Sequence, residues 1–162
     1  RATFEGLTYL SSIGTAGWAR GRGLGTLVTR LAAADGLAES DTLVYLDARP
    51  IGKPRDLDMA ASMLRQLSGR THEVCTGVAI AALGGSELRT FHVISHVTFK
   101  PLTEAVIREY HSRIEPLDKS GAYAVQDESA MIIERVDGSW SNVKGLPMER
   151  LREELAQVQR RS

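Results

Sequence analysis

EVCTGVAIAAL at residues 73–83 and LRTFHVISHVTF at residues 88–99 decide the fold of this chain. Both segments are rich in β-branched and aromatic side chains, which favour extended strands. Gly84, Gly85 and Ser86 stand between them, and such residues are typical of the turn of a hairpin. The two segments therefore predict a pair of neighbouring antiparallel strands.

The segment before this hairpin predicts a strand, a turn and a helix. Residues 42–46 (TLVYL) form a short strand-favouring run, and residues 47–52 supply turn residues. Asp56 is placed to cap a helix that runs through Leu67, and Gly69 is placed to end it. One face of this helix carries apolar residues that are expected to pack on the core: Leu57, Ala60, Ala61, Leu64 and Leu67.

The segment after the hairpin predicts two more helices and a strand. A helix is expected from Thr103 to about His111, and residues 131–133 (MII) predict a buried strand whose turn is Asp137-Gly138. The last helix follows Pro147. The apolar residues expected to be buried by the two helices are Val106, Ile107 and Tyr110, then Met148, Leu151, Leu155 and Val158. Interleaved strands and helices favour an α/β fold on a mixed β-sheet.

Residues 1–40 differ from the rest of the chain. They are rich in small side chains, with five glycines between residues 14 and 25. Glycine raises the entropic cost of ordering the backbone, so a loop is predicted there. Residues 27–34 predict a short helix that ends near Gly36. The chain is thus expected to be one domain over residues 41–162, preceded by an atypical segment over residues 1–40.

Composition limits the class of partner and the compartment. Lys plus Arg equals Asp plus Glu at 20 each, so the net charge gives no reason to expect a nucleic acid polymer. No apolar run approaches the roughly 18 residues of a membrane span. Cys75 is the single cysteine, which excludes an internal disulfide and favours the cytoplasm. The chain begins at Arg1 without a secretion signal, so we expect that an upstream segment was removed or never included.

Several glycine-rich and polar blocks follow one another along the strand and helix pattern, from residue 40 to residue 147. The blocks are SDTLV (40–44), IGKP (51–54), LSGRTHEVCTGV (67–78), EPLDKSGAY (115–123), Gln126 and GSWSNVKGLP (138–147). In order and spacing they resemble the Maf family of nucleotide pyrophosphatases, from residue 41 to about residue 155. Any one block recurs by chance, whereas the whole series in sequence is a specific signal.

The resemblance implies an elongated, ITPase-like α/β domain with a central cleft. It implies hydrolysis of a nucleoside triphosphate to the monophosphate and pyrophosphate with a divalent cation, magnesium or manganese. It leaves the ligands of that metal unassigned. The expected partners are the nucleotide and, because the family is often dimeric, a second copy of the chain. A link to septum formation is also implied.

Two residues are expected to perform the chemistry. Cleavage between the α- and β-phosphates needs a positioned water, a proton acceptor and cations beside the phosphates. Asp41 stands where the family has its proton acceptor, although local sequence alone favours a capping or turn aspartate. Lys53 precedes Pro54, which restricts its backbone to extended forms and so could direct its ammonium group to a phosphate. The alternative for Lys53 is a solvated loop lysine.

The substrate is expected to be dTTP or UTP. In the family, the residue after the catalytic aspartate and a later glutamine mark this branch, and they correspond here to Thr42 and Gln126. A glutamine amide offers both a donor and an acceptor to a pyrimidine edge. Taken alone, Thr42 is a strand residue and Gln126 a surface residue. The other expected substrate-binding residues are Arg70, otherwise part of a helix stop, and Asp118 and Lys119, otherwise a solvated turn.

Residues 1–40 lack two features of the family. These are the Ser-x-Ser-Pro-Arg-Arg-like loop and the acidic segment that helps to hold the metal, and Arg20 and Arg22 are the local substitutes. The first reading is an active dTTP/UTP pyrophosphatase. The second is a catalytically impaired Maf-like protein that binds nucleotides or another protein in cell-division control. The third is an α/β domain without a surviving site.

Overall fold

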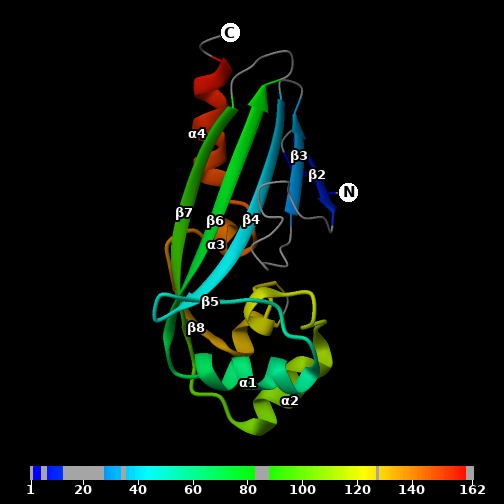
Figure 1. Ribbon diagram of the computed structural model, residues 1–162, viewed down its shortest axis with the longest axis vertical. Coiled ribbons are helices and arrows are strands. Elements are labelled where there is room, and N and C mark those ends of the chain that lie inside the picture. Colours follow the sequence, from blue (N-terminus) through cyan, green and yellow to red (C-terminus); the bar gives the residue numbers. More distant parts are fainter. Residues whose placement is uncertain are drawn as a thin grey trace.

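The computed structural model describes residues 2–4, 7–12, 28–33, 36–82, 88–126 and 128–159, and side chains within 40–80, 89–126 and 128–157. An elongated sheet forms the body of the protein (Figure 1). Its central strands are β4 (Gly36–Leu46), β6 (Thr71–Ala82) and β7 (Leu88–Phe99), which pair in that order. The hairpin predicted from the sequence is therefore confirmed, and Gly77 lies opposite His92 in its register.

The remaining strands extend this sheet on both sides. β1 (Ala2–Phe4), β2 (Leu7–Ser12) and β3 (Val28–Ala33) continue it beyond β4, and β8 (Ile133–Asp137) pairs with β7. The short strand β5 (Arg49–Ile51) pairs with the end of β4 across a turn at Asp47 and Ala48, both of which have positive φ. The prediction of an α/β class is confirmed.

The expectation of a mixed sheet is wrong, because every strand pair in the described residues is antiparallel. Parallel neighbours need a connection that carries the chain back across the sheet. Here the helix α1 (Leu57–Leu67) lies at the lower end of the sheet (Figure 1). The chain therefore enters β6 from the same end at which it left β4, and the two strands run in opposite directions.

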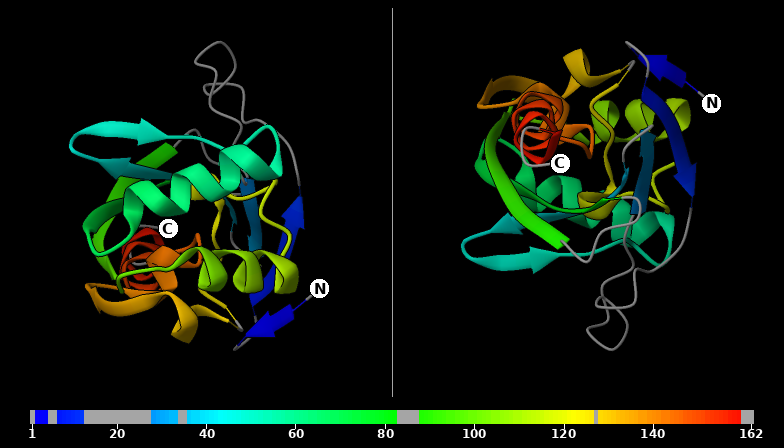
Figure 2. Two further views of the ribbon diagram at one scale, coloured as in Figure 1. Left: turned by 90° about the horizontal axis from the view of Figure 1, so that it is seen from below. Right: turned by 90° about the horizontal axis from the view of Figure 1, so that it is seen from above.

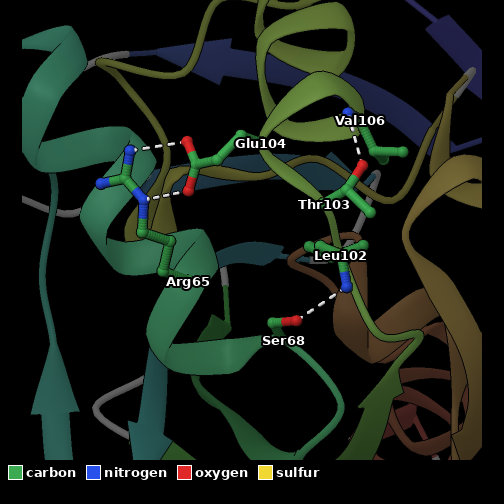
Figure 3. Close-up of polar contacts among 6 residues, drawn as sticks. All are labelled: Arg65, Ser68, Leu102, Thr103, Glu104 and Val106. Atoms are coloured by element: carbon green, nitrogen blue, oxygen red, sulfur yellow. Dashed lines mark hydrogen bonds and ion pairs between the residues drawn. The ribbon is translucent and has the colours of Figure 1, made fainter.

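Helix α1 forms where the sequence predicts it because its ends are capped. The Asp56 carboxylate accepts a hydrogen bond of 2.7 Å from the Met59 amide, and Gly69 follows the helix with φ of 67°. Helix α2 (Glu104–Arg113) starts after Thr103, whose hydroxyl accepts from the Val106 amide. Figure 2 shows the two helices side by side, and in Figure 3 Arg65 and Glu104 join them by a two-pronged ion pair.

The core lies between these helices and the lower ends of the central strands. Its largest fully buried side chains include Tyr110, Phe99, Leu64 and Leu67. A second, smaller cluster joins helix α4 (Met148–Gln159) to β6 and β7, where Leu151 packs with Val78 and Ile80. Figure 2 shows α4 end-on against these strands. No helix in the described part of the chain is long and apolar enough to cross a bilayer.

Two leucines of α1 test which face of the helix stabilises the fold. Leu64 is fully buried, whereas Leu57, which was expected on the same face, is 58% exposed. We expect Leu64→Ala to lower the free energy of unfolding by roughly 2–5 kcal/mol, because a buried leucine leaves a cavity when it is truncated. The matched variant Leu57→Ala should change it by less than about 0.5 kcal/mol. Urea denaturation measures both, and equal losses would contradict the packing.

Three predictions about secondary structure are wrong. Residues 28–33 of the expected helix at 27–34 form β3, because pairing with β2 and β4 outweighs the helix preference of the alanines. The described parts of residues 1–40 are strands rather than loop. The strand expected at residues 131–133 begins only at Ile133, after the short 3-10 helix η2 (Ser129–Met131). The glycines at 14–25 lie outside the described residues.

Candidate active site

A pocket opens beside the middle of β4. Its wall is formed by β4, β6, the loop before α1, the segment around the 3-10 helix η1 (Ser120–Ala122), and the short helix α3 (Trp140–Val143) with the turn that follows. One part of the lining is polar: Thr42, Lys53, Asp118, Lys119, Ser120, Gln126 and Lys144. The other part is apolar, apart from one glycine: Val44, Val74, Tyr123, Ala124, Val125, Val143 and Gly145. Such a lining can hold a ligand that is apolar at one end and charged at the other.

Five of the residues predicted from the sequence meet in this pocket. They come from the strand β4, the loop before α1 and the segment around η1: Thr42, Lys53, Asp118, Lys119 and Gln126. Arg70 does not join them. Its guanidinium group instead binds the exposed carboxylate of Asp47 at 2.7 and 2.8 Å, at the turn between β4 and β5. Arg70 therefore ties the end of α1 to that turn rather than facing the pocket.

Asp41 lies next to the pocket without lining it. Neighbouring side chains of a strand alternate between its faces, so the pocket takes Thr42 from β4 and not Asp41. Asp41 is only 4% exposed, and its Oδ1 atom has no hydrogen-bond partner among the described residues. Burial raises the pKa of Asp41 to about 6, although the nearby Lys53 ammonium opposes this shift. Asp41 is thus a carboxylate close to a lysine and with one oxygen unused.

The turn after α3 is fastened to the sheet beside Asp41. The buried hydroxyl of Ser40 donates a 2.8 Å hydrogen bond to the Gly145 carbonyl. Asn142 is fully buried, and its side-chain amide donates to the Val74 carbonyl and to the Ser95 hydroxyl, both at 3.0 Å. Gly145 has φ of 104°, a conformation that favours glycine. These contacts fix the position of Lys144, a pocket residue that no sequence pattern predicted.

Lysine is the cation of this pocket. The chain has 16 arginines and only four lysines, yet Lys53, Lys119 and Lys144 all line the pocket and no described arginine does. Of these three lysines, only Lys119 forms an ion pair with a described residue, the Asp118 carboxylate at 2.9 Å. A lysine ammonium is a compact point charge suited to a phosphate oxygen. The pocket therefore offers two unpaired ammonium groups to an anion.

The apolar wall contains a buried aromatic group. The ring of Tyr123 packs edge-on against Phe99 and His72, and its hydroxyl lies 2.8 Å from Nε2 of His72. Burial lowers the pKa of His72 to about 4, so this histidine is neutral at pH 7. Burial also raises the pKa of the Cys75 thiol, which agrees with a packing role and not with a nucleophile. His72 therefore supports the wall through its contacts with Tyr123 and Phe99.

The chemistry of one pocket carboxylate, Asp118, suits a divalent cation that is also bound by phosphates. The described residues contain no group of three or more His, Cys, Asp or Glu side chains that could hold a metal by themselves. However, Asp41 and Asp118 each have a buried Oδ1 atom without a described partner. Magnesium is commonly bound by one or two carboxylates together with substrate phosphates. Asp118, which lines the pocket, is the described residue that would hold it.

Comparison with known proteins finds a family and relatives that cover most of this chain. The family of Maf-like proteins matches residues 25–158. A dTTP/UTP pyrophosphatase of Akkermansia muciniphila is 50% identical over 109 residues, which cover 67% of this chain and 57% of that protein. A dTTP/UTP pyrophosphatase of Carboxydothermus hydrogenoformans is 42% identical over 116 residues, covering 72% of this chain and 62% of that protein. The chain therefore spans less than two thirds of the length of these relatives.

Proposed function

The chain belongs to the family of Maf-like proteins, and from this membership we propose that it hydrolyses nucleoside triphosphates, preferring dTTP and UTP, to the monophosphate and pyrophosphate. The observation that carries the proposal is the meeting of five residues, expected from separate sequence blocks, in one pocket. The names of the relatives, dTTP/UTP pyrophosphatases, support the choice of substrate.

In this proposal the two kinds of pocket wall bind the two ends of the nucleotide. The base and sugar lie against the apolar part around Val74, Tyr123 and Val125. The phosphates lie near Lys53 and Lys144, whose charges offset the negative charge that develops during cleavage. Thr42 and Gln126 bind the edge of the base, because both side chains carry polar atoms that can form hydrogen bonds with it.

Asp41 is the proposed general base, and Asp118 is the proposed metal-binding carboxylate. Bound magnesium or manganese would supply charge neutralisation of the phosphates and a more acidic water. Asp41 would accept the proton of the attacking water through its unused Oδ1 atom. Since Asp41 does not itself line the pocket, this role requires that a phosphate held at Lys53, whose ammonium group is close to Asp41, brings the water within its reach. Lys53 is near enough to Asp41 to stabilise the ionised carboxylate and so keep it able to accept that proton.

The rate should depend on pH through Asp41. Burial raises the pKa of this group to about 6, so below that pH an increasing share of the base is protonated and inactive. We expect kcat/KM to fall roughly tenfold per pH unit below this value and to level off above it. A pH profile of the wild-type protein measures this. A flat profile through pH 6, or an inflection close to an ordinary aspartate pKa near 4, would contradict the role.

A competition assay tests the proposed substrate. UTP, dTTP and 7-methyl-GTP are supplied together, and the consumption of each is followed. We expect UTP and dTTP to be consumed first, whereas faster consumption of 7-methyl-GTP would overturn the substrate choice. Thermal stabilisation by nucleotides without any product would instead favour the second reading, an impaired nucleotide-binding protein, since a ligand that binds only the folded state stabilises it.

The Maf-like pyrophosphatase domain is proposed to comprise residues 41–162, and residues 1–40 an atypical N-terminal segment whose described strands extend the same sheet. Arg20 and Arg22, the local substitutes for the missing arginine loop, lie outside the described residues. The family match nevertheless begins at residue 25. If residues 1–40 supply no cation cluster, hydrolysis should be weak, and the lysines of the pocket would carry the binding of phosphate. The homodimer, the cytoplasmic location and the link to septum formation stay expectations.

A further inference from the structure

Two threonine hydroxyls behind the pocket form a hydrogen-bond chain with one direction. Thr42 and Thr76 face each other across β4 and β6, and their Oγ1 atoms are 2.9 Å apart. The Thr76 hydroxyl also lies 3.1 Å from the Asn142 carbonyl oxygen. A carbonyl oxygen only accepts, so the single proton of Thr76 points to Asn142. Thr42 must then donate its own proton to Thr76.

The short distance between Thr76 and Asn142 opposes a reversed arrangement of these protons. Thr76 is fully buried, and the backbone carbonyl oxygen of Asn142, at the end of α3, is also held by the Gly145 amide at 2.8 Å. If Thr76 donated to Thr42 instead, the lone pairs of the Thr76 hydroxyl and the Asn142 carbonyl would face each other at 3.1 Å. Thr42 lines the pocket, and its hydroxyl has no other hydrogen-bond partner among the described residues. Its proton therefore points away from the pocket, and only its lone pairs face a ligand. The structure thus presents Thr42 to the pocket as an acceptor.

An acceptor in this position selects between pyrimidine bases. Uracil and thymine carry a hydrogen on N3, whereas N3 of cytosine is a bare acceptor. Gln126 cannot make this choice alone, because its amide can rotate to present either a donor or an acceptor. We propose that Thr76 is a positioning residue that holds the Thr42 hydroxyl as an acceptor, so that the pocket takes uracil and thymine nucleotides and rejects cytosine nucleotides. This inference rests on the proposed function, in that it takes a pyrimidine nucleotide as the ligand.

The test compares binding of the α,β-imido analogues of UTP and CTP, which cannot be cleaved at the proposed bond. In the variant Thr76→Val the Thr42 hydroxyl loses its acceptor and becomes free to donate to cytosine N3. We expect the ratio of the Kd for the CTP analogue to the Kd for the UTP analogue to fall roughly tenfold, the effect of one mismatched hydrogen bond. Thr76→Ser keeps the hydroxyl and should restore the wild-type ratio.

A second threonine pair on the same strand provides the control. Thr71 of β6 and Thr98 of β7 have their hydroxyls 2.9 Å apart, but they are outside the pocket. Thr71→Val should leave the Kd ratio unchanged. If Thr76→Val only lowered the overall stability, the binding of both analogues would weaken together. The inference requires instead that the ratio of the two Kd values changes. A ratio within twofold of the wild-type value in folded Thr76→Val would overturn it.

Wild-type protein supplies a measurement that needs no variant. In 3-deaza-UTP a C–H group replaces the N3–H donor, so its affinity should be roughly tenfold lower than that of UTP. Equal affinities would overturn the inference even if Thr76→Val fails to fold. Absence of binding by both analogues, or equal binding of both, would overturn it as well. Preference for the UTP analogue without hydrolysis of UTP would sustain the inference and refute the proposed activity.

Discussion

Asp41→Asn is expected to lower the turnover of UTP by roughly 10²- to 10⁴-fold, the usual cost of removing a general base. Asparagine has almost the same shape as aspartate but does not accept a proton at neutral pH. The carboxylate is buried and its pKa is raised to about 6. Turnover is measured as pyrophosphate released per enzyme, with saturating UTP and magnesium.

The fold should survive this substitution. A group whose pKa is raised on folding contributes stability that is present at low pH and is lost as the pH rises through its folded pKa, here about 6. At pH 7 the ionised Asp41 therefore costs stability, and Asp41→Asn should be at least as stable as the wild type. Asp47→Asn is the matched control, since asparagine tolerates its positive φ and Asp47 lies outside the pocket. A loss of less than tenfold in Asp41→Asn would refute the role.

Lys53→Ala is expected to lower kcat/KM by roughly 10- to 100-fold, the usual scale for a hydrogen bond to a charged group. Lys53 lines the pocket, and Pro54 limits the backbone conformations from which its side chain extends. Its removal also takes away the charge that lowers the pKa of Asp41. The inflection of the pH profile should therefore move to higher pH in the variant.

Lys100→Ala is the matched control for Lys53→Ala. Lys100 is exposed and donates to the Ala130 carbonyl, at a position that does not line the pocket. Steady-state kinetics of both variants with UTP and dTTP separate a specific loss from a general effect of removing a lysine. If affinity, rate and pH profile are all unchanged in Lys53→Ala, Lys53 is a solvated loop lysine.

Elements with local signals could be predicted from the sequence. The helix at residues 57–67 carries its own cap at Asp56, and the β6–β7 hairpin carries its own turn glycines, so neither needs a distant contact to be recognised. The strand β3 has no such signal. Its alanines suit a helix, and only its pairing with β2 and β4 makes it extended. The antiparallel pairing of β4 and β6 likewise depends on where α1 packs, and no local sequence pattern encodes that position.

Some residues of the candidate site could likewise be predicted from the sequence, and others could not. Family blocks brought Thr42, Lys53, Gln126 and their neighbours into consideration, and the fold places most of them in one pocket. Arg70 is absent from it because Asp47, from another element, binds its side chain. Thr76 and Asn142 were missed because their roles come from contacts between residues 34 to 68 positions apart in the chain.

The most direct test of the account is the identity of the products. Wild-type protein is incubated with UTP or dTTP and magnesium or manganese, and the products are separated by anion-exchange chromatography. The account predicts equal amounts of nucleoside monophosphate and pyrophosphate, and no reaction when a chelator removes the metal. Nucleoside diphosphate with inorganic phosphate, or intact nucleotide in the presence of metal, would contradict it.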